Sequence, residues 1–136
     1  MTDDSALPGA GKRILVVDDE RLVRRVVGLM LRSQGYTVDE ADGVTSAFDQ
    51  FKAQQDKGGY VAVITDVQMP NEDGFALGHK LRALSPELPL VFISGSTTSP
   101  HAFQDKHSLQ LFKPLETEQL ADALHTLLSS SECSAK

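Results

Sequence analysis

The stretch RILVVDDERLVRR, residues Arg13 to Arg25, is the first indication of the fold class of this chain. It contains an apolar run, Ile14–Val17, which is typical of a strand buried on both faces of a parallel sheet. The strand leads directly into Asp18, Asp19 and Glu20, whose mutual repulsion costs free energy unless a cation relieves it. Acids also suit the positive end of a helix dipole, so a helix start and a metal site are both open for this stretch.

Composition limits the classes of protein that the chain can be. Its 136 residues, 40% of them hydrophobic, suffice for one domain with a hydrophobic core. No apolar run approaches the ~20 residues of a membrane span, and the acidic amino-terminal segment lacks the apolar region of a secretory signal. A single cysteine, Cys133, excludes a disulfide framework. The net charge of −6 argues against a nucleic-acid surface. Because a secretory signal and a disulfide framework are both lacking, we expect the protein to be cytoplasmic and to contact neither nucleic acid nor membrane directly.

Strands and helices are expected to alternate along the rest of the chain. Further strands are expected at Tyr36–Ala41, Tyr60–Thr65, Leu88–Ser94 and Leu109–Phe112. The charged residues Asp39 and Glu40 favour an edge position for the first of these, because charges block further strand pairing. Five strand–helix units in a row predict a doubly wound α/β fold, with a parallel sheet and helices on both faces.

The helices between these strands are predicted from apolar stripes and from capping residues. The first helix starts at Arg21 and carries one apolar stripe, which includes Leu22 and Val26. Asp42 and Asp73 are expected to cap the second and third helices. The apolar residues of the last helix are Leu120, Ala123, Leu124, Leu127 and Leu128. We therefore expect a domain over residues 12–129, a flexible leader over 1–11 and a flexible tail over 130–136.

Polar side chains follow four of the predicted strands. Asp18 and Asp19 follow the first strand and Asp66 the third, while Ser94 ends the fourth and Lys113 follows the fifth. Ligands of doubly wound sheets bind beyond the carboxyl ends of the strands, so we expect these side chains to converge. Three carboxylates without histidine or cysteine suit Mg²⁺. Asp66 can then attack phosphorus and form an acyl phosphate, with charge stabilised by Mg²⁺, Lys113 and Ser94.

Four segments, ILVVDDE, VITDVQMPNEDG, VFISG and LFKP, occur in this order and together resemble a two-component response-regulator receiver domain. The resemblance covers about residues 12–129 and implies a flavodoxin-like sheet with strand order 2-1-3-4-5. It also implies phosphotransfer from a sensor histidine kinase or a phosphotransfer protein. The chain would then signal to an output protein by protein–protein interaction, without being an enzyme itself.

Residue roles follow from the same resemblance. It implies that Asp66 is the phosphoacceptor and that Lys113 and Ser94 bind the phosphoryl group. The implied Mg²⁺ ligands are Asp18, Asp19, Asp66 and the backbone carbonyl of Gln68.

The resemblance also assigns positions around the site. Gly95 would leave space for the phosphoryl group, and Met69-Pro70 and Gly74 would belong to the loop that shapes the site. Pro114 would follow a cis peptide bond, which only proline makes at low cost.

Two features depart from the receiver pattern. Gln110 stands three residues before the lysine, where receivers usually have Tyr or Phe. We expect Gln110 to stay at the surface, because burying an amide costs free energy unless it finds hydrogen bonds. The stretch between Ser94 and Lys113 is also short, so the fourth helix, which begins at Ser99-Pro100, is expected to be stunted.

Three other readings of the sequence are possible. The chain could be the receiver segment of a hybrid sensor histidine kinase, which would carry the same motifs. A Mg²⁺-dependent phosphohydrolase that forms an aspartyl phosphate would place its nucleophile in a D-x-D motif after the first strand, whereas Asp18 and Asp19 are adjacent. A degenerate receiver that serves only as a scaffold is disfavoured, because every acid and Lys113 are present.

Overall fold

The computed structural model describes residues 12–69, 74–95, 107–113 and 115–134. In these ranges five strands form one sheet: β1 (Arg13–Val17), β2 (Thr37–Ala41), β3 (Ala62–Asp66), β4 (Leu90–Ser94) and β5 (Ser108–Phe112). All neighbouring strands are parallel, and their order across the sheet is β2-β1-β3-β4-β5. The predicted doubly wound, flavodoxin-like sheet with strand order 2-1-3-4-5 is therefore confirmed, and β2 lies at an edge as predicted.

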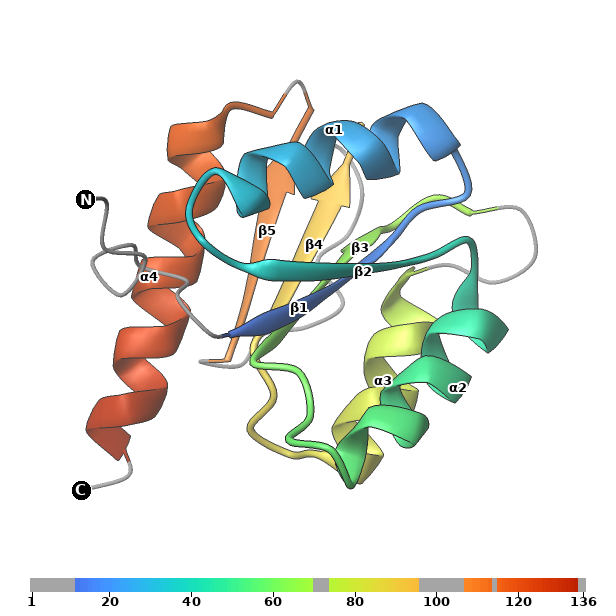
Figure 1. Cartoon of the computed structure of the whole chain (residues 1–136), viewed down its shortest axis with the longest axis vertical. Coiled ribbons are helices and arrows are strands. Elements are labelled where there is room, and N and C mark those ends of the chain that lie inside the picture. Colours follow the sequence, from blue (N-terminus) through green and yellow to red (C-terminus); the bar gives the residue numbers. More distant parts are fainter. Residues whose placement is uncertain (1–11, 70–73, 96–106, 114, 135–136) are drawn as a thin grey trace.

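Helices cover both faces of this sheet. Those in the described ranges are α1 (Arg21–Arg32), α2 (Val44–Gln55), α3 (Gly74–Leu84) and α4 (Thr117–Ser134). Helices α1 and α4 lie on one face, and α2 and α3 lie on the other (Figure 1). None of the helices in this part of the chain is both long and apolar enough to span a membrane.

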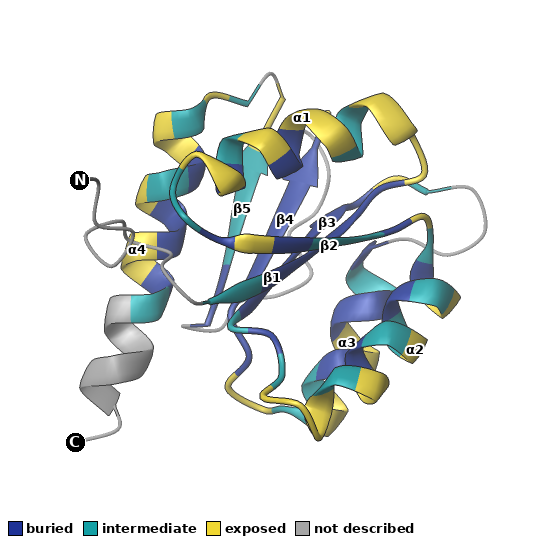
Figure 2. Cartoon of the chain, in the orientation of Figure 1, coloured by how far each residue is buried: buried dark blue, intermediate teal, exposed yellow. Residues whose placement is uncertain are grey.

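Each face of the sheet has its own hydrophobic core. On the side of α2 and α3, Phe51 and Leu77 belong to a buried cluster with Phe92 of β4. On the side of α1 and α4, Val27 and Leu124 belong to a second cluster that includes other strand residues. Figure 2 shows the central strands β1, β3 and β4 almost entirely buried. Burial on both faces explains why the sequences of these strands are continuous apolar runs.

The register of the strands brings their carboxyl ends to a common edge. Val17 of β1 is paired with Thr65 of β3, and Asp66 follows as the last residue of β3. The main-chain nitrogen of Lys113, just after β5, donates a hydrogen bond to the carbonyl oxygen of Ser94 at 2.9 Å. The polar residues selected from the sequence therefore lie along one edge of the sheet.

Some element ends differ from the prediction. The cap of α2 is Gly43 and not Asp42, because the first helical residue is Val44, so Asp42 lies one position too early. Helix α4 ends at Ser134, so residues 130–134, predicted to be flexible, are helical. No Gly or Pro interrupts the chain between residues 129 and 134, which permits this extension.

Several expectations concern residues outside the described ranges. They are the flexible leader at residues 1–11, Pro70 of the site loop, the cap at Asp73, the stunted helix after Ser99-Pro100 and the cis peptide bond before Pro114.

Candidate functional site

Three carboxylates gather at the carboxyl edge of the sheet. Asp18 and Asp19 follow β1, and Asp66 ends β3. One oxygen of each carboxylate lies within 4.8 Å of the others. Asp18 and Asp66 are buried whereas Asp19 is exposed, so water can reach the cluster from one side. The sheet has brought together the three acids that were predicted to bind a metal ion.

Two of these acids, Asp18 and Asp66, have raised pKa values. Burial is the main cause that raises the pKa of Asp18 to about 6, and the charges of Asp66 and Asp19 add to it. The backbone N–H of Glu20 donates to Oδ1 of Asp18 at 2.9 Å and opposes this rise in pKa. Burial also raises the pKa of Asp66. A bound cation would relieve the repulsion and favour the charged carboxylates.

Lys113 supplies a positive charge beside the acids. Its Nζ lies 3.7 Å from Oδ2 of Asp66, and its side chain is partly exposed. The ammonium charge lowers the pKa of Asp66 and so opposes the effect of burial on that group. The predicted phosphoryl-binding lysine therefore lies against the predicted phosphoacceptor.

The remaining predicted site residues lie around Asp66. Ser94 is fully buried at the end of β4. A Cβ atom added to Gly95 would have no heavy atom of the described residues within 4 Å. The main-chain nitrogen of Gln68 donates to Oδ1 of Asp66 at 3.4 Å, so Gln68 lies beside the carboxylate.

Helix α3 approaches the end of β3 so closely that its first residue has no room for a side chain. A Cβ atom added to Gly74 would lie only 2.2 Å from the main-chain oxygen of Asp66 and 3.1 Å from Oγ1 of Thr65. The main-chain nitrogen of Gly74 donates to the carbonyl oxygen of Val67 at 2.8 Å. The glycine thus permits the contact between α3 and the strand end that carries Asp66.

The expectation that Gln110 stays at the surface is wrong for this structure. Gln110 is half-buried and is paired with Phe92 in the sheet. Its Nε2 atom is buried and has no hydrogen-bond partner among the residues that the structure describes. Side chains alternate along a strand, and Leu109 and Leu111 pack on the core beside α1 and α4, so Gln110 faces the opposite side. Pairing in the sheet therefore places the Gln110 amide in a partly buried position, although an amide is more stable where water can hydrogen-bond to it.

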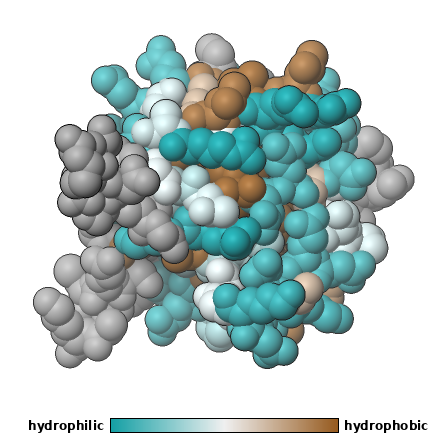
Figure 3. Space-filling model, in the orientation of Figure 1, coloured by the Kyte–Doolittle hydropathy of each residue, from teal (hydrophilic) through white to brown (hydrophobic). Residues whose placement is uncertain are grey.

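An apolar groove beside α1 was not predicted from the sequence. Leu22, Val26 and Leu29 are 77%, 50% and 64% exposed, although the first two were assigned to one apolar stripe with core residues. Apolar side chains gather over α1 in Figure 3. The groove has a volume of about 440 Å³ and is lined by Leu22, Val23, Val26, Val27, Met30, Ile93, Lys113 and Leu115. The sequence did contain an indication of this groove, because α1 has more apolar residues than one core-facing stripe needs.

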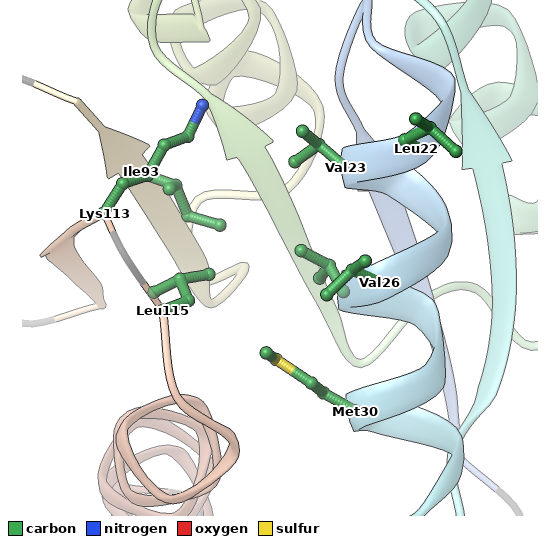
Figure 4. A pocket seen from close by; sticks show the side chains of 8 residues that line it. Leu22, Val23, Val26, Met30, Ile93, Lys113 and Leu115 are labelled. Atoms are coloured by element: carbon green, nitrogen blue, oxygen red, sulfur yellow. The ribbon is translucent and has the colours of Figure 1, made fainter.

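Figure 4 shows how the groove is built. Val23, Val26 and Met30 project from α1 toward Lys113 and Leu115, which lie after β5. Since Lys113 also contacts Asp66, the groove adjoins the acidic cluster.

Known proteins are similar to this chain in sequence and in fold. Residues 14–125 match the response regulator receiver domain family. The chain is 32% identical over 117 residues to the C4-dicarboxylate transport regulator DctD of Rhizobium meliloti, covering 84% of this chain but only 25% of that protein.

Two solved structures are also similar. The receiver domain of the hybrid histidine kinase CckA is 34% identical with a TM-score of 0.72, covering 85% of this chain and 98% of that one. TrrA of Thermotoga maritima, in complex with Mg²⁺–BeF, is 25% identical with a TM-score of 0.75, covering 86% of this chain and 99% of that one.

Proposed function

This chain belongs to the response regulator receiver domain family, and we propose that Asp66 is its phosphoacceptor. Receiver domains are signalling modules of two-component systems. The donor is the phosphohistidine of a sensor histidine kinase or of a phosphotransfer protein. The phosphorylated chain then acts by binding an output protein and performs no further enzymatic reaction.

One observation carries this proposal. Oxygens of Asp18, Asp19 and Asp66 lie within 4.8 Å of one another, and Nζ of Lys113 lies 3.7 Å from Oδ2 of Asp66. A carboxylate that lies near both a cation-binding acid pair and an ammonium group is suited to attack phosphorus, because nearby positive charge stabilises the transferred phosphoryl group.

The transfer itself requires few groups. A carboxylate oxygen of Asp66 forms a bond to phosphorus while the bond from phosphorus to the donor histidine breaks. The electron pair of that bond returns to the imidazole nitrogen, which takes up a proton. The Lys113 ammonium neutralises charge on the phosphoryl oxygens, and the Ser94 hydroxyl donates a hydrogen bond to one of them.

The acidic cluster fits Mg²⁺. Asp18, Asp19 and Asp66 supply oxygen donors, and the backbone carbonyl of Gln68 is proposed as a fourth protein ligand. Hard cations prefer such ligands, and Mg²⁺ keeps several water molecules when it binds few protein groups. When bound, Mg²⁺ supplies positive charge to the phosphoryl oxygens and relieves repulsion between the carboxylates.

Mg²⁺ is expected to raise the melting temperature of the protein. At a Mg²⁺ concentration one hundred times Kd, the stabilisation is about 2.7 kcal/mol, because the ion binds only the folded chain. Asp19→Ala should remove most of this effect with little damage to the fold, since Asp19 is exposed. Differential scanning fluorimetry with and without Mg²⁺ tests this, with exposed Asp49 on α2 replaced by Ala as the control. An equal response to Mg²⁺ in the Asp19 and Asp49 variants would contradict the site.

The stabilisation of the folded protein by Mg²⁺ should weaken at low pH. The pKa of Asp18 is raised from 3.8 to about 6, so as the pH falls through this window the folded, metal-free protein binds a proton that the unfolded chain does not. The metal-free protein therefore gains stability from this carboxyl as the pH falls, and the proton competes with Mg²⁺. The shift in melting temperature caused by Mg²⁺ should be smaller at pH ~5 than at pH ~7.

The apolar groove beside α1 is the proposed docking surface of the phosphodonor protein. A histidine can reach Asp66 only if its carrier covers the surface around the acidic cluster, and the groove reaches Lys113 at that cluster. The exposed arginines Arg21 and Arg25 lie on the same helix as the exposed Leu22. The surface therefore suits an apolar helix face that is flanked by acidic side chains.

Leu22→Glu is expected to slow phosphotransfer from a protein donor by roughly tenfold or more, because an apolar contact becomes a charge next to acidic partner residues. Labelling by acetyl phosphate, which needs no docking, should be unchanged. The donor for this assay is the fastest kinase found by phosphotransfer profiling in the source organism. Leu84→Glu, at the far end of α3 and also exposed, serves as the matched control. Equal rates for the Leu22 and Leu84 variants with the protein donor would rule out this docking surface.

The remaining parts of the proposal concern the whole chain. Residues 12–129 form the receiver domain, and the protein acts in the cytoplasm without binding nucleic acid or membrane directly. A receiver segment of a hybrid kinase is the second candidate, supported by the similarity to the CckA receiver domain. A phosphohydrolase is disfavoured, because the acids after β1 are adjacent instead of spaced as D-x-D.

A further inference from the structure

Arg24 of α1 makes contacts that its place in the sequence does not reveal. Its Nη1 donates a hydrogen bond to the main-chain oxygen of Asp18 at 2.8 Å. Its Nε donates to Oε1 of Glu40 on the edge strand β2 at 3.3 Å. Only 15% of the Arg24 side chain is exposed, so the guanidinium is held between the turn after β1 and the neighbouring strand.

We propose that Arg24 is a positioning residue that fixes the turn carrying Asp18 and Asp19, and thereby sets the Mg²⁺ affinity of the acidic cluster. The inference rests on the proposed function, because it assigns a role toward the metal that this function requires. Arg24 binds the carbonyl of Asp18 and not its carboxylate. It therefore acts on the direction of the main chain and leaves the carboxylate oxygens available to the ion.

Three hydrogen-bonding contacts hold the turn after β1. The main-chain nitrogen of Asp18 donates to the carbonyl oxygen of Ala41 on β2 at 3.1 Å. Oδ1 of Asp18 accepts a hydrogen bond from the backbone N–H of Glu20 at 2.9 Å. Arg24 supplies the third contact, and its side chain links this turn to both α1 and β2.

The chemistry of arginine suits this task. A guanidinium presents several donors in a rigid plane, so it can bind a carbonyl and a carboxylate at once in fixed directions. Lysine has one compact ammonium group on a flexible chain and cannot reproduce both directions. Groups that orient metal ligands in this way typically change metal affinity by about 10–100-fold when they are replaced.

The test measures Mg²⁺ binding to the full chain by isothermal titration calorimetry at fixed neutral pH. Arg24→Gln and Arg24→Lys are compared with Arg32→Ala, which removes an exposed arginine from the last position of the same helix. The expected result is a Kd for Mg²⁺ that rises about 10–100-fold in Arg24→Gln, rises in Arg24→Lys as well, and stays unchanged in Arg32→Ala. Melting temperatures of the metal-free proteins are measured in parallel.

Two results would overturn the inference in different ways. If an Arg24 variant melts earlier but binds Mg²⁺ as the parent does, Arg24 is merely structural. If the parent itself does not bind Mg²⁺, the proposed function fails and the inference fails with it. Should Arg24→Gln not fold, Arg24→Lys decides the question, because it keeps the charge and most of the length of the side chain.

Discussion

Gly74→Ala is expected to destabilise the protein by about 2 kcal/mol or more, a large share of the roughly 5–15 kcal/mol that stabilises a typical domain. The added Cβ would lie 2.2 Å from the main-chain oxygen of Asp66. A flexible side chain could move aside, but here the obstacle is the backbone of a buried strand. Helix α3 must therefore shift away from β3, and Asp66 must shift with its strand end.

Unfolding by urea, followed by circular dichroism, measures this loss. Gly28→Ala is the matched control, because it also adds one methyl group to a glycine at a helix. Its Cβ would meet its nearest neighbours at 3.4 Å or more, and the nearest is the flexible end of Arg32. This control should keep or gain stability, by up to about 1 kcal/mol, because Ala favours the helix over Gly. If Gly74→Ala is as stable as Gly28→Ala, the close approach of α3 to β3 is wrong.

The fold could be predicted because the sequence pattern and the sheet geometry agree. Strands buried on both faces must be apolar along their whole length, and Ile14–Val17 and Leu90–Ser94 are such runs. Parallel strands place all their carboxyl ends at one edge, so Asp18, Asp66 and Lys113 had to lie near one another once the strands were assigned.

Other features depend on angles and distances that no local pattern contains. The need for Gly74 arises from how closely α3 packs on β3, and the contacts of Arg24 arise from the position of β2 beside α1. The half-buried state of Gln110 follows from its pairing with Phe92, which a single strand does not reveal. The cap of α2 falls one residue later than Asp42, because side-chain preference at a cap is weaker than the tertiary packing that sets where a helix begins.

The groove beside α1 could not be predicted from the sequence for a different reason. Periodicity shows which residues of a helix are apolar, but it does not show how wide a stripe the core will cover. The core covers Val27 and Leu31, whereas Leu22 and Leu29 remain exposed. An apolar surface that the fold leaves uncovered is a candidate binding site for a partner protein. Leu22→Glu therefore tests partner binding at this surface.

Asp66→Asn is expected to abolish phosphorylation, the largest effect on function that any single substitution should have. Asn keeps the size of the side chain and can still accept hydrogen bonds from Gln68, so the fold should survive. It lacks the negatively charged oxygen that attacks phosphorus and cannot form an acyl phosphate. It also removes a buried carboxylate whose pKa is raised chiefly by burial, next to Asp18, whose pKa is raised as well, so metal-free stability should not fall.

Whether Asp66 is the Mg²⁺-dependent phosphoacceptor is tested by the intact mass of the parent and of Asp66→Asn after incubation with acetyl phosphate and Mg²⁺. We expect one phosphoryl adduct on the parent, no adduct on the variant, and no adduct on the parent once Mg²⁺ is chelated. The adduct on the parent should be lost in mild base, as an acyl phosphate is, whereas a phosphoserine would persist. An adduct on Asp66→Asn at the level of the parent, or a parent that is labelled equally without Mg²⁺, would contradict the assignment of this site.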